Sequence, residues 1–213
     1  MAGKKKKRQA DARKGLEDQV IKAAFKRVEE YGWRRLTLYD ISQDTDLTME
    51  QLLAVFPNKA ALLKAYVQRV DCRALDDFTA EEDDSTRDQL FDLMMRRFDE
   101  MDADKAALKA IAQEACCDPN TICVSSCGLL QSMQKVLVRA GIKTSGLHGK
   151  LKIKGLSLIF LAAFRTWLRD NTEDMSKTMA ELDKRLSQAE AFEQGLCRFA
   201  CRRRTSSQTQ AAA

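Results

Sequence analysis

Apolar residues recur every three or four positions along most of the chain, which is the spacing of helices that bury one side. The first such stretch holds Leu16, Val20, Ala23, Ala24, Val28 and Tyr31. Gly32 follows it, and glycine commonly lies just beyond the last residue of a helix. This pattern predicts a helix that begins near Leu16 and ends before Gly32.

Two short helices are predicted next from their capping residues. Thr37 is followed three positions later by Asp40, and Thr48 is followed three positions later by Gln51. A threonine that begins a helix can accept a bond from the third backbone N–H, while the side chain there can bond back. The sequence therefore predicts one helix from Thr37, a short break, and a second helix from Thr48 that stops at Pro57.

A longer helix is expected to begin near Asn58, with its apolar side formed by Leu62, Leu63, Tyr66, Val67 and Val70. Two short helices that are joined by a tight turn and held between longer ones form a helix-turn-helix. In such a unit the second short helix can enter the major groove of DNA. We therefore predict a DNA-binding domain over 15–70.

The same helical spacing continues through the second half of the chain. An acidic connection over 79–84 is followed by helices expected over 85–101, 104–116, 121–140, 150–168 and from 175 onward. A loop is predicted over 141–149, and it contains the only histidine, His148. The 150–168 segment is apolar on nearly all sides, which predicts burial on both faces and a hairpin with the last helix.

Composition agrees with an all-α protein of about nine helices, because the 213 residues include only nine glycines and two prolines. The expected parts are a disordered basic arm (1–14), the DNA-binding domain (15–70), a ligand-binding and dimerisation domain (71–200) and a disordered tail (201–213). Seven cysteines without a signal peptide favour a reducing, cytoplasmic location. The most apolar run, 156–164, is too short to span a bilayer, so no transmembrane helix is expected.

The positive charge of the chain is confined to its two ends. Residues 1–14 carry a net charge of +6 and residues 198–204 carry +4, whereas the whole chain carries +5. The predicted DNA-binding domain holds eight cations and eight carboxylates and is neutral. The basic ends are either solubilising tails or arms that follow DNA phosphates, and the composition leaves both open.

A set of positions in the first helices stands at the spacing of a known family signature: Val20, Ala23, Ala24, Gly32, Thr37, Ile41, Leu47, Thr48, Leu52, Phe56, Lys59 and Leu62. Over residues 16–66 the chain resembles the TetR family of transcriptional regulators. The resemblance implies an all-helical, TetR-like homodimer. It also implies that an N-terminal helix-turn-helix binds double-stranded DNA and that a C-terminal domain binds a ligand.

The recognition helix departs from the family pattern. The turn position that is usually glycine is Asp46. The position that usually holds an aromatic residue is Leu53, and the one that usually holds an aromatic residue or histidine is Val55. On its exposed face, Gln51 is a natural reader of adenine, whereas Glu50 would repel phosphates unless it met a cytosine amino group. The residues predicted to contact DNA are Lys4, Lys5, Lys6, Lys7, Arg8, Arg34, Arg35, Thr37, Tyr39, Thr48, Met49, Gln51 and Lys59.

A second resemblance lies in the C-terminal half. The long apolar helix that ends at 165–168, the turn at 170–174 and the segment 182–186 resemble the lipid-binding accessory proteins of ubiquinone biosynthesis. Those proteins share the TetR-like fold and are not held to bind DNA. The resemblance implies an alternative function, a lipid-binding accessory protein in which the helix-turn-helix is only a scaffold.

Both resemblances fit an apolar or lipid-like effector in the C-terminal half. The candidate pocket residues are Phe98, Met101, Met133, Leu137, Phe160 and Phe164. The alternative interpretation is that these side chains pack against one another as ordinary core without a cavity. In TetR-like proteins the last two helices form the homodimer interface. The corresponding residues here are Trp167, Met175, Met179, Leu182, Leu186 and Phe192.

Candidate catalytic chemistry is sparse in this sequence. The chain has one histidine and no phosphate-binding glycine loop, so we expect neither an enzyme nor a cofactor. Cysteines at 116, 117, 123 and 127 lack the spacing of a structural zinc site. No metal is expected, and these cysteines are interpreted as small core residues, with metal binding and redox sensing left open.

Overall fold

A computed structural model describes the backbone of residues 2–76, 78–79, 84–115 and 118–210. Side chains are described for 13–76, 78–79, 84–114 and 118–195. This part of the chain is all-α, as the apolar spacing predicts. Its helices are α1 (Ala2–Tyr31), α2 (Leu38–Asp44), α3 (Met49–Val55), α4 (Lys59–Asp76), α5 (Thr86–Asp102), α6 (Lys105–Ala115), α7 (Pro119–Arg139), α8 (Gly146–Trp167) and α9 (Ser176–Gln210).

Helix boundaries differ from the predictions at three places. The structure begins α1 at Ala2 and carries α9 to Gln210, where the sequence predicts disordered ends. The end segments are rich in Lys, Arg, Gln and Ala, which favour helix without an apolar face. Helix α8 begins at Gly146, so the prediction that His148 lies in a loop is wrong. Leu147, in the first turn of this helix, is 83% exposed. An apolar residue on the solvent side does not fit the one-sided apolar pattern from which a helix start is recognised.

The chain divides into two compact units, neither of which is continuous in sequence. Unit 1 comprises residues 1–77 and 97–135, and unit 2 comprises 78–96 and 136–213. Helices α5 and α7 therefore contribute residues to both units. A compact unit is not by itself a functional domain, so the predicted domain boundaries stay predictions.

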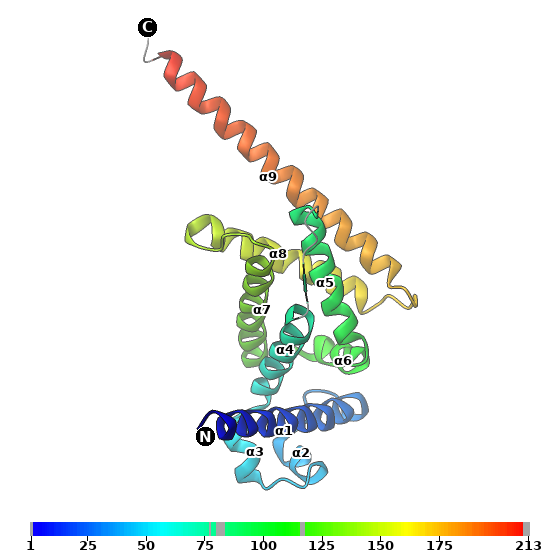
Figure 1. Cartoon of the computed structure of the whole chain (residues 1–213). Coiled ribbons are helices and arrows are strands. Elements are labelled where there is room, and N and C mark those ends of the chain that lie inside the picture. Colours follow the sequence, from blue (N-terminus) through cyan, green and yellow to red (C-terminus); the bar gives the residue numbers. More distant parts are fainter. Residues whose placement is uncertain (1, 77, 80–83, 116–117, 211–213) are drawn as a thin grey trace. The chain divides into compact units, whose positions relative to one another are not determined.

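In unit 1, α2 and α3 lie along one side of α1 (Figure 1). Their apolar residues meet in one core that includes Val20, Ala24, Val28, Ile41, Leu52, Phe56, Leu62 and Tyr66, all at most 2% exposed. Each helix supplies residues three or four positions apart, as the sequence predicts. This core fixes the direction in which the two short helices present their outer faces.

Unit 1 also contains a buried charged cluster around Asp71, which is 2% exposed and lies on α4. Its carboxylate accepts a hydrogen bond from Ser132 Oγ at 2.5 Å and an ion pair from Lys135 Nζ at 3.0 Å, both on α7. The guanidinium of Arg97 on α5 pairs with the same carboxylate. Burial lowers the pKa of Arg97, and the negative charge of Asp71 opposes this shift. The cluster holds three helices of unit 1 at one point.

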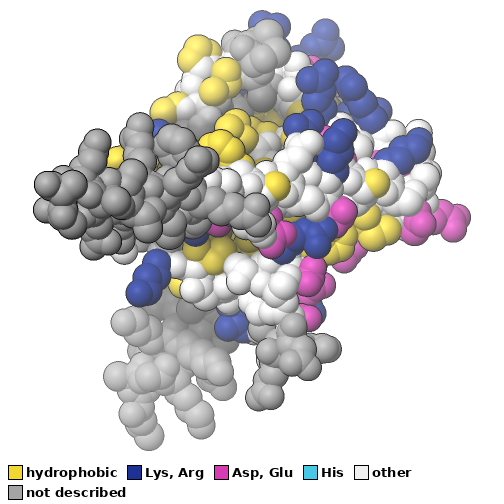
Figure 2. Space-filling model, turned by 90° about the horizontal axis from the view of Figure 1, so that it is seen from above, with side chains coloured by type: hydrophobic (Ala, Val, Ile, Leu, Met, Phe, Trp, Pro, Cys, Tyr) yellow, Lys and Arg dark blue, Asp and Glu magenta, His cyan; other side chains and the backbone are white. Residues whose placement is uncertain are grey.

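In unit 2, α8 and α9 pack as the predicted hairpin (Figure 1). Leu156, Phe160 and Trp167 of α8 are buried, as are Leu182 and Leu186 of α9. The prediction that α8 is buried on both faces is wrong for the single chain. The opposite face of α8 is exposed at Leu151 (62%), Leu158 (68%) and Leu161 (48%). Figure 2 shows hydrophobic side chains that reach the surface between charged ones.

The hairpin turn is organised by Asp170, which is fully buried. Its carboxylate accepts hydrogen bonds from the hydroxyls of Thr172 (2.6 Å) and Thr178 (2.8 Å) and from their backbone N–H groups. Burial alone would raise the pKa of Asp170. The hydrogen bonds outweigh burial and hold that pKa below its usual value.

We expect Asp71→Asn to lower the free energy of unfolding by about 3–5 kcal/mol, because it leaves the buried charge of Arg97 without its carboxylate partner. Urea unfolding followed by circular dichroism measures this change. The control is Asp92→Asn, which removes an exposed ion pair with Arg96 and should cost less than about 1 kcal/mol. Equal losses in the two variants would show that the cluster does not stabilise the core.

Asp170→Asn should remove a pH-dependent part of the stability. Since the pKa of Asp170 is lowered by folding, its contribution is present above the unfolded pKa of about 4 and is lost as the pH falls below it. The difference in unfolding free energy between the wild type and Asp170→Asn should thus be full at pH 7 and shrink between about pH 5 and pH 2. The control is Glu173→Gln, an exposed site in the same turn. A difference that does not vary with pH would contradict this account.

Candidate nucleic-acid interface

Both predicted capping boxes are confirmed. Asp40 N–H donates to Thr37 Oγ1 at 3.2 Å, and Thr37 N–H donates back to Asp40 Oδ2 at 3.0 Å. In α3, Gln51 N–H donates to Thr48 Oγ1 at 3.2 Å, and Thr48 N–H donates to Gln51 Oε1 at 3.0 Å. These reciprocal bonds satisfy backbone donors that a helix start leaves open, and they fix where each short helix begins.

The turn between α2 and α3 has a left-handed backbone at the position where the family usually has glycine. Asp46 has a φ of +53°, a conformation that aspartate adopts more readily than most residues other than glycine. Before it, the hydroxyl of the buried Thr45 donates to the carbonyl of Ile41 at 2.8 Å. The turn therefore keeps the geometry of a helix-turn-helix without the usual glycine.

Helix α1 is joined to α2 by an ion pair. Arg27 donates to both carboxylate oxygens of Asp44, at 2.5 and 2.8 Å, and lies 3.9 Å from Asp40. The bond to Asp44 raises the pKa of Arg27, and the same bond lowers the pKa of Asp44. The pKa of Asp40 is lowered chiefly by its bond to Thr37. Arg27 is thus committed to a bidentate contact with its own chain at the surface, although its charge alone would suggest a phosphate ligand.

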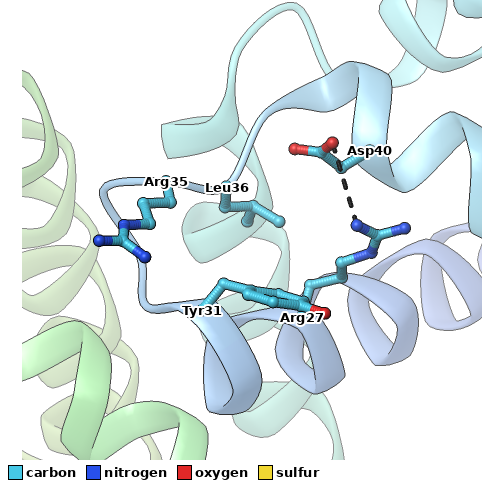
Figure 3. A pocket seen from close by; sticks show the side chains of 5 residues that line it. All are labelled: Arg27, Tyr31, Arg35, Leu36 and Asp40. Atoms are coloured by element: carbon cyan, nitrogen blue, oxygen red, sulfur yellow. Dashed lines mark ion pairs between the residues drawn. The ribbon is translucent and has the colours of Figure 1, made fainter.

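A shallow pocket of about 230 Å³ opens between the end of α1 and the turn that leads into α2. It is lined by Arg27, Tyr31, Arg35, Leu36 and Asp40. The side chain of Arg35 points away from the Arg27–Asp40 pair (Figure 3). The pocket therefore places one exposed guanidinium and the exposed ring of Tyr31 beside the start of α2.

The exposed face of α3 offers few groups that could read bases. Glu50 and Gln51 are exposed, and Met49 is half-buried. The side-chain oxygen of Gln51 accepts the capping bond from Thr48, and its amide N–H groups are its donors toward a base edge. The bidentate pairing of glutamine with adenine uses the oxygen as well, so it would require the second lone pair of the capping oxygen. Leu53, where the family usually has an aromatic residue, is 44% exposed.

Some of the residues predicted to contact DNA are accessible to it, and others already form hydrogen bonds within the protein. Arg34, Arg35 and Tyr39 are exposed around the start of α2. Lys59 is half-buried, and its Nζ donates to the carbonyl of Trp33 at 3.2 Å. The side chains of Lys4, Lys5, Lys6, Lys7 and Arg8 lie outside the described residues. Thr37 and Thr48 use their hydroxyls as caps.

The predicted effector residues fall in both units. Phe98, Met101 and Met133 belong to unit 1, and Leu137, Phe160 and Phe164 belong to unit 2. Phe164 is half-buried, and the rest are at most 6% exposed. An effector site at these positions stays a prediction.

The predicted dimer residues differ in accessibility. Trp167, Leu182 and Leu186 are buried inside unit 2, Met175 and Met179 are half-buried, and Phe192 is 64% exposed. The buried ones stabilise the α8–α9 hairpin of their own chain. The sequence could not show this division, because both faces of α8 are apolar.

The interpretation of the cysteines as core residues is wrong for Cys123 and Cys127, which are exposed free thiols on α7. The periodicity does not distinguish them from buried positions, because cysteine is small and weakly polar. Cys116 and Cys117 lie outside the described residues. Within the described part of the chain, no three His, Cys, Asp or Glu side chains gather into a group that could hold a metal ion. No helix there is long and apolar enough to cross a membrane.

Sequence reasoning missed the polar contacts that hold this region together. These contacts involve Arg27, Asp44, Asp71 and Glu114, which all lie on helices that the sequence predicts. Their partners are 17 to 80 residues away in the chain. No local spacing reports such pairs.

No protein-family model matches the chain, and no curated protein matches it. Solved structures do resemble it. A TetR transcriptional regulator from Nitrosomonas europaea matches with a TM-score of 0.65 and 20% identity, covering 83% of this chain and 98% of its own. A TetR transcriptional regulator from a Rhodococcus species matches with a TM-score of 0.60 and 16% identity, covering 81% and 94%. The chain therefore has the fold of the TetR transcriptional regulators.

Proposed function

We propose that the chain is a ligand-responsive transcriptional repressor that binds operator DNA as a homodimer. The observation that carries this proposal is the helix-turn-helix of α2 and α3. Both of its helices begin with complete capping boxes, and it occurs in a chain whose fold matches that of TetR regulators over most of its length. Two capped short helices in this arrangement suit the major groove.

The affinity for DNA would come mainly from phosphate contacts. The helix-turn-helix is neutral overall, and Arg27 is occupied by Asp44. The exposed cations at the turn before α2 are Arg34 and Arg35, and residues 4–8 of the basic arm supply five more. Contacts of this kind position a protein on DNA and carry little sequence information.

Sequence preference would come from a few residues of α3. The amide N–H groups of Gln51 can donate to acceptors on a base edge, and Met49 can contact a thymine methyl group. Glu50 would be tolerated only next to a donor such as the cytosine amino group. We therefore expect modest sequence discrimination for each half-site, with two half-sites needed for a specific operator.

A second copy of the chain is the proposed partner of α8. Leu151, Leu158 and Leu161 form one exposed apolar face of a helix whose other face is already buried. The exposed side chains of Lys150 and Lys154 accompany this face, and α9 exposes carboxylates at Glu190 and Glu193, the latter paired with Lys152 of its own α8 at 3.1 Å. A twofold axis would bring the basic side of one hairpin to the acidic side of the other. These features support an interface centred on α8 rather than on the buried positions predicted from the sequence.

The ligand response would be a linkage between two sites. An apolar effector that prefers one spacing of the two recognition helices changes operator affinity by its difference in affinity for the two spacings. The predicted pocket residues of unit 2, Leu137, Phe160 and Phe164, are the proposed effector region. A repressor of this type releases DNA when the effector is bound.

Titration of DNA from upstream of the coding sequence at several salt concentrations tests the DNA-binding proposal. We expect specific binding that weakens with salt, because each phosphate contact contributes roughly −0.9 to the slope of log affinity against log salt concentration. Arg35→Ala should weaken binding and reduce the slope by about 1. Alanine at all five arm positions should reduce it further. Arg169→Ala, which removes an exposed cation from unit 2, is the control and should leave the slope unchanged.

Binding with no preference for any upstream sequence would overturn the proposal. If isoprenoid lipid also co-purified with the protein, the result would favour the lipid-binding accessory protein instead.

Leu158→Asp should shift the protein from dimer to monomer, because an isologous interface receives the substituted carboxylate twice. We expect the dimer dissociation constant to rise at least tenfold, about 1.4 kcal/mol, as measured by light scattering over a dilution series. Ile122→Asp is the matched control, an exposed apolar residue on α7 in unit 1. A dimer that tolerates Leu158→Asp as well as it tolerates Ile122→Asp would place the interface elsewhere.

A further inference from the structure

The turn between α1 and α2 carries the exposed Arg34 and Arg35, and it is built around a buried tryptophan. Trp33 is fully buried, although the sequence places it in a connection between two helices. Gly32 precedes it with a φ of +84°, a conformation that favours glycine. The backbone of the turn therefore directs the Trp33 side chain into the core and the Arg34 side chain to the surface.

Helix α6 contacts this turn through Glu114. The backbone N–H of Arg34 donates to Glu114 Oε2 at 2.7 Å. A Cβ at Gly32 would lie 2.5 Å from Glu114 Oε1, so the same carboxylate fills the space beside the glycine. A single side chain of α6 therefore contacts both residues that flank Trp33.

Helix α7 contacts the turn through Thr121. The indole N–H of Trp33 donates to Thr121 Oγ1 at 3.3 Å, and both side chains are fully buried. The hydroxyl of Thr121 in turn donates to Asp118 Oδ2 at 2.5 Å, which lowers the pKa of Asp118. The hydroxyl is thereby oriented so that its lone pairs can accept the indole N–H.

Helix α4 completes the enclosure with Lys59. Its Nζ donates to the carbonyl of Trp33 and lies 5.2 Å from the centre of the indole ring. This is the distance of a cation–π contact. The side chain and carbonyl of Trp33 and the backbone N–H of Arg34 are thus all held by elements other than α1 and α2.

We infer that Glu114 and Thr121 are positioning residues for DNA binding, because they set the backbone that presents Arg34 and Arg35. This inference rests on the proposed function. It means that the DNA-binding surface is not completed by residues 15–70. Two helices that the sequence assigns to the ligand-binding domain supply its inner support.

Substitutions of Glu114 separate positioning from simple charge, because the two effects have opposite signs. Glu114→Gln and Glu114→Ala both remove a negative charge near the two arginines. By charge alone, both should tighten the binding of DNA. Only Glu114→Gln keeps an oxygen that can accept the N–H of Arg34.

DNA binding by the full chain is measured for the wild type, Glu114→Ala and Glu114→Gln at fixed salt concentration. Positioning predicts that Glu114→Ala weakens binding about tenfold, the effect of losing one hydrogen bond to a charged group. Glu114→Gln should bind at least as tightly as the wild type. Glu173→Gln, which removes an exposed carboxylate from unit 2, is the charge control. Tighter binding by both Glu114 variants would overturn the inference.

Amide hydrogen exchange at Arg34 gives a readout that does not need DNA. The Arg34 N–H should exchange faster in Glu114→Ala than in the wild type or in Glu114→Gln. In Thr121→Val, the indole N–H of Trp33 should exchange faster than in the wild type. If exchange rises in Glu114→Ala but DNA binding does not change, the contact exists without positioning the arginines, and the inference fails.

If the wild type binds no DNA at all, it is the proposed function that fails. The exchange rates then decide alone whether Glu114 holds the turn. Equal exchange of the Arg34 N–H in all variants would show that Glu114 does not hold the turn, and the inference would fail too.

Discussion

The burial of Trp33 is the constraint on which the candidate DNA-binding surface depends. Burying a tryptophan removes about 150–250 Å² of surface from water and contributes about 4–6 kcal/mol. That gain requires a partner for the indole N–H, and the partner is Thr121 on α7. The turn that carries two exposed arginines is therefore tied to the interior of unit 1. A surface that binds DNA needs such support, because loosely held cations lose more conformational entropy when they bind.

Each unit also contains one buried carboxylate that several donors satisfy. Asp71 joins α4, α5 and α7 in unit 1, and Asp170 closes the α8–α9 turn in unit 2. Apolar surfaces alone allow neighbouring helices to slide, whereas a buried carboxylate is stable only where its donors meet it. Removing either carboxylate would leave buried donors without their partner, which is the costly change.

The recognition helix shows how one residue can serve two roles. Gln51 caps α3 through its side-chain oxygen and presents its amide N–H groups outward. With Glu50 beside it and a neutral helix-turn-helix around it, the unit would depend on phosphate contacts for affinity and on dimer symmetry for specificity. The exposed apolar face of α8 is consistent with this dependence, since a single copy would read too short a sequence.

The sequence by itself determined the helices, because apolar spacing and capping are local properties. Thr37 with Asp40 and Thr48 with Gln51 predicted the helix starts, and Gly32 predicted the end of α1. Tertiary structure alone decided which apolar face of α8 is buried, that Lys59 turns inward to Trp33, and that Glu114 supports Arg34. These features join residues far apart in the chain. Their energies depend on the distance and burial of both partners, which no local pattern contains.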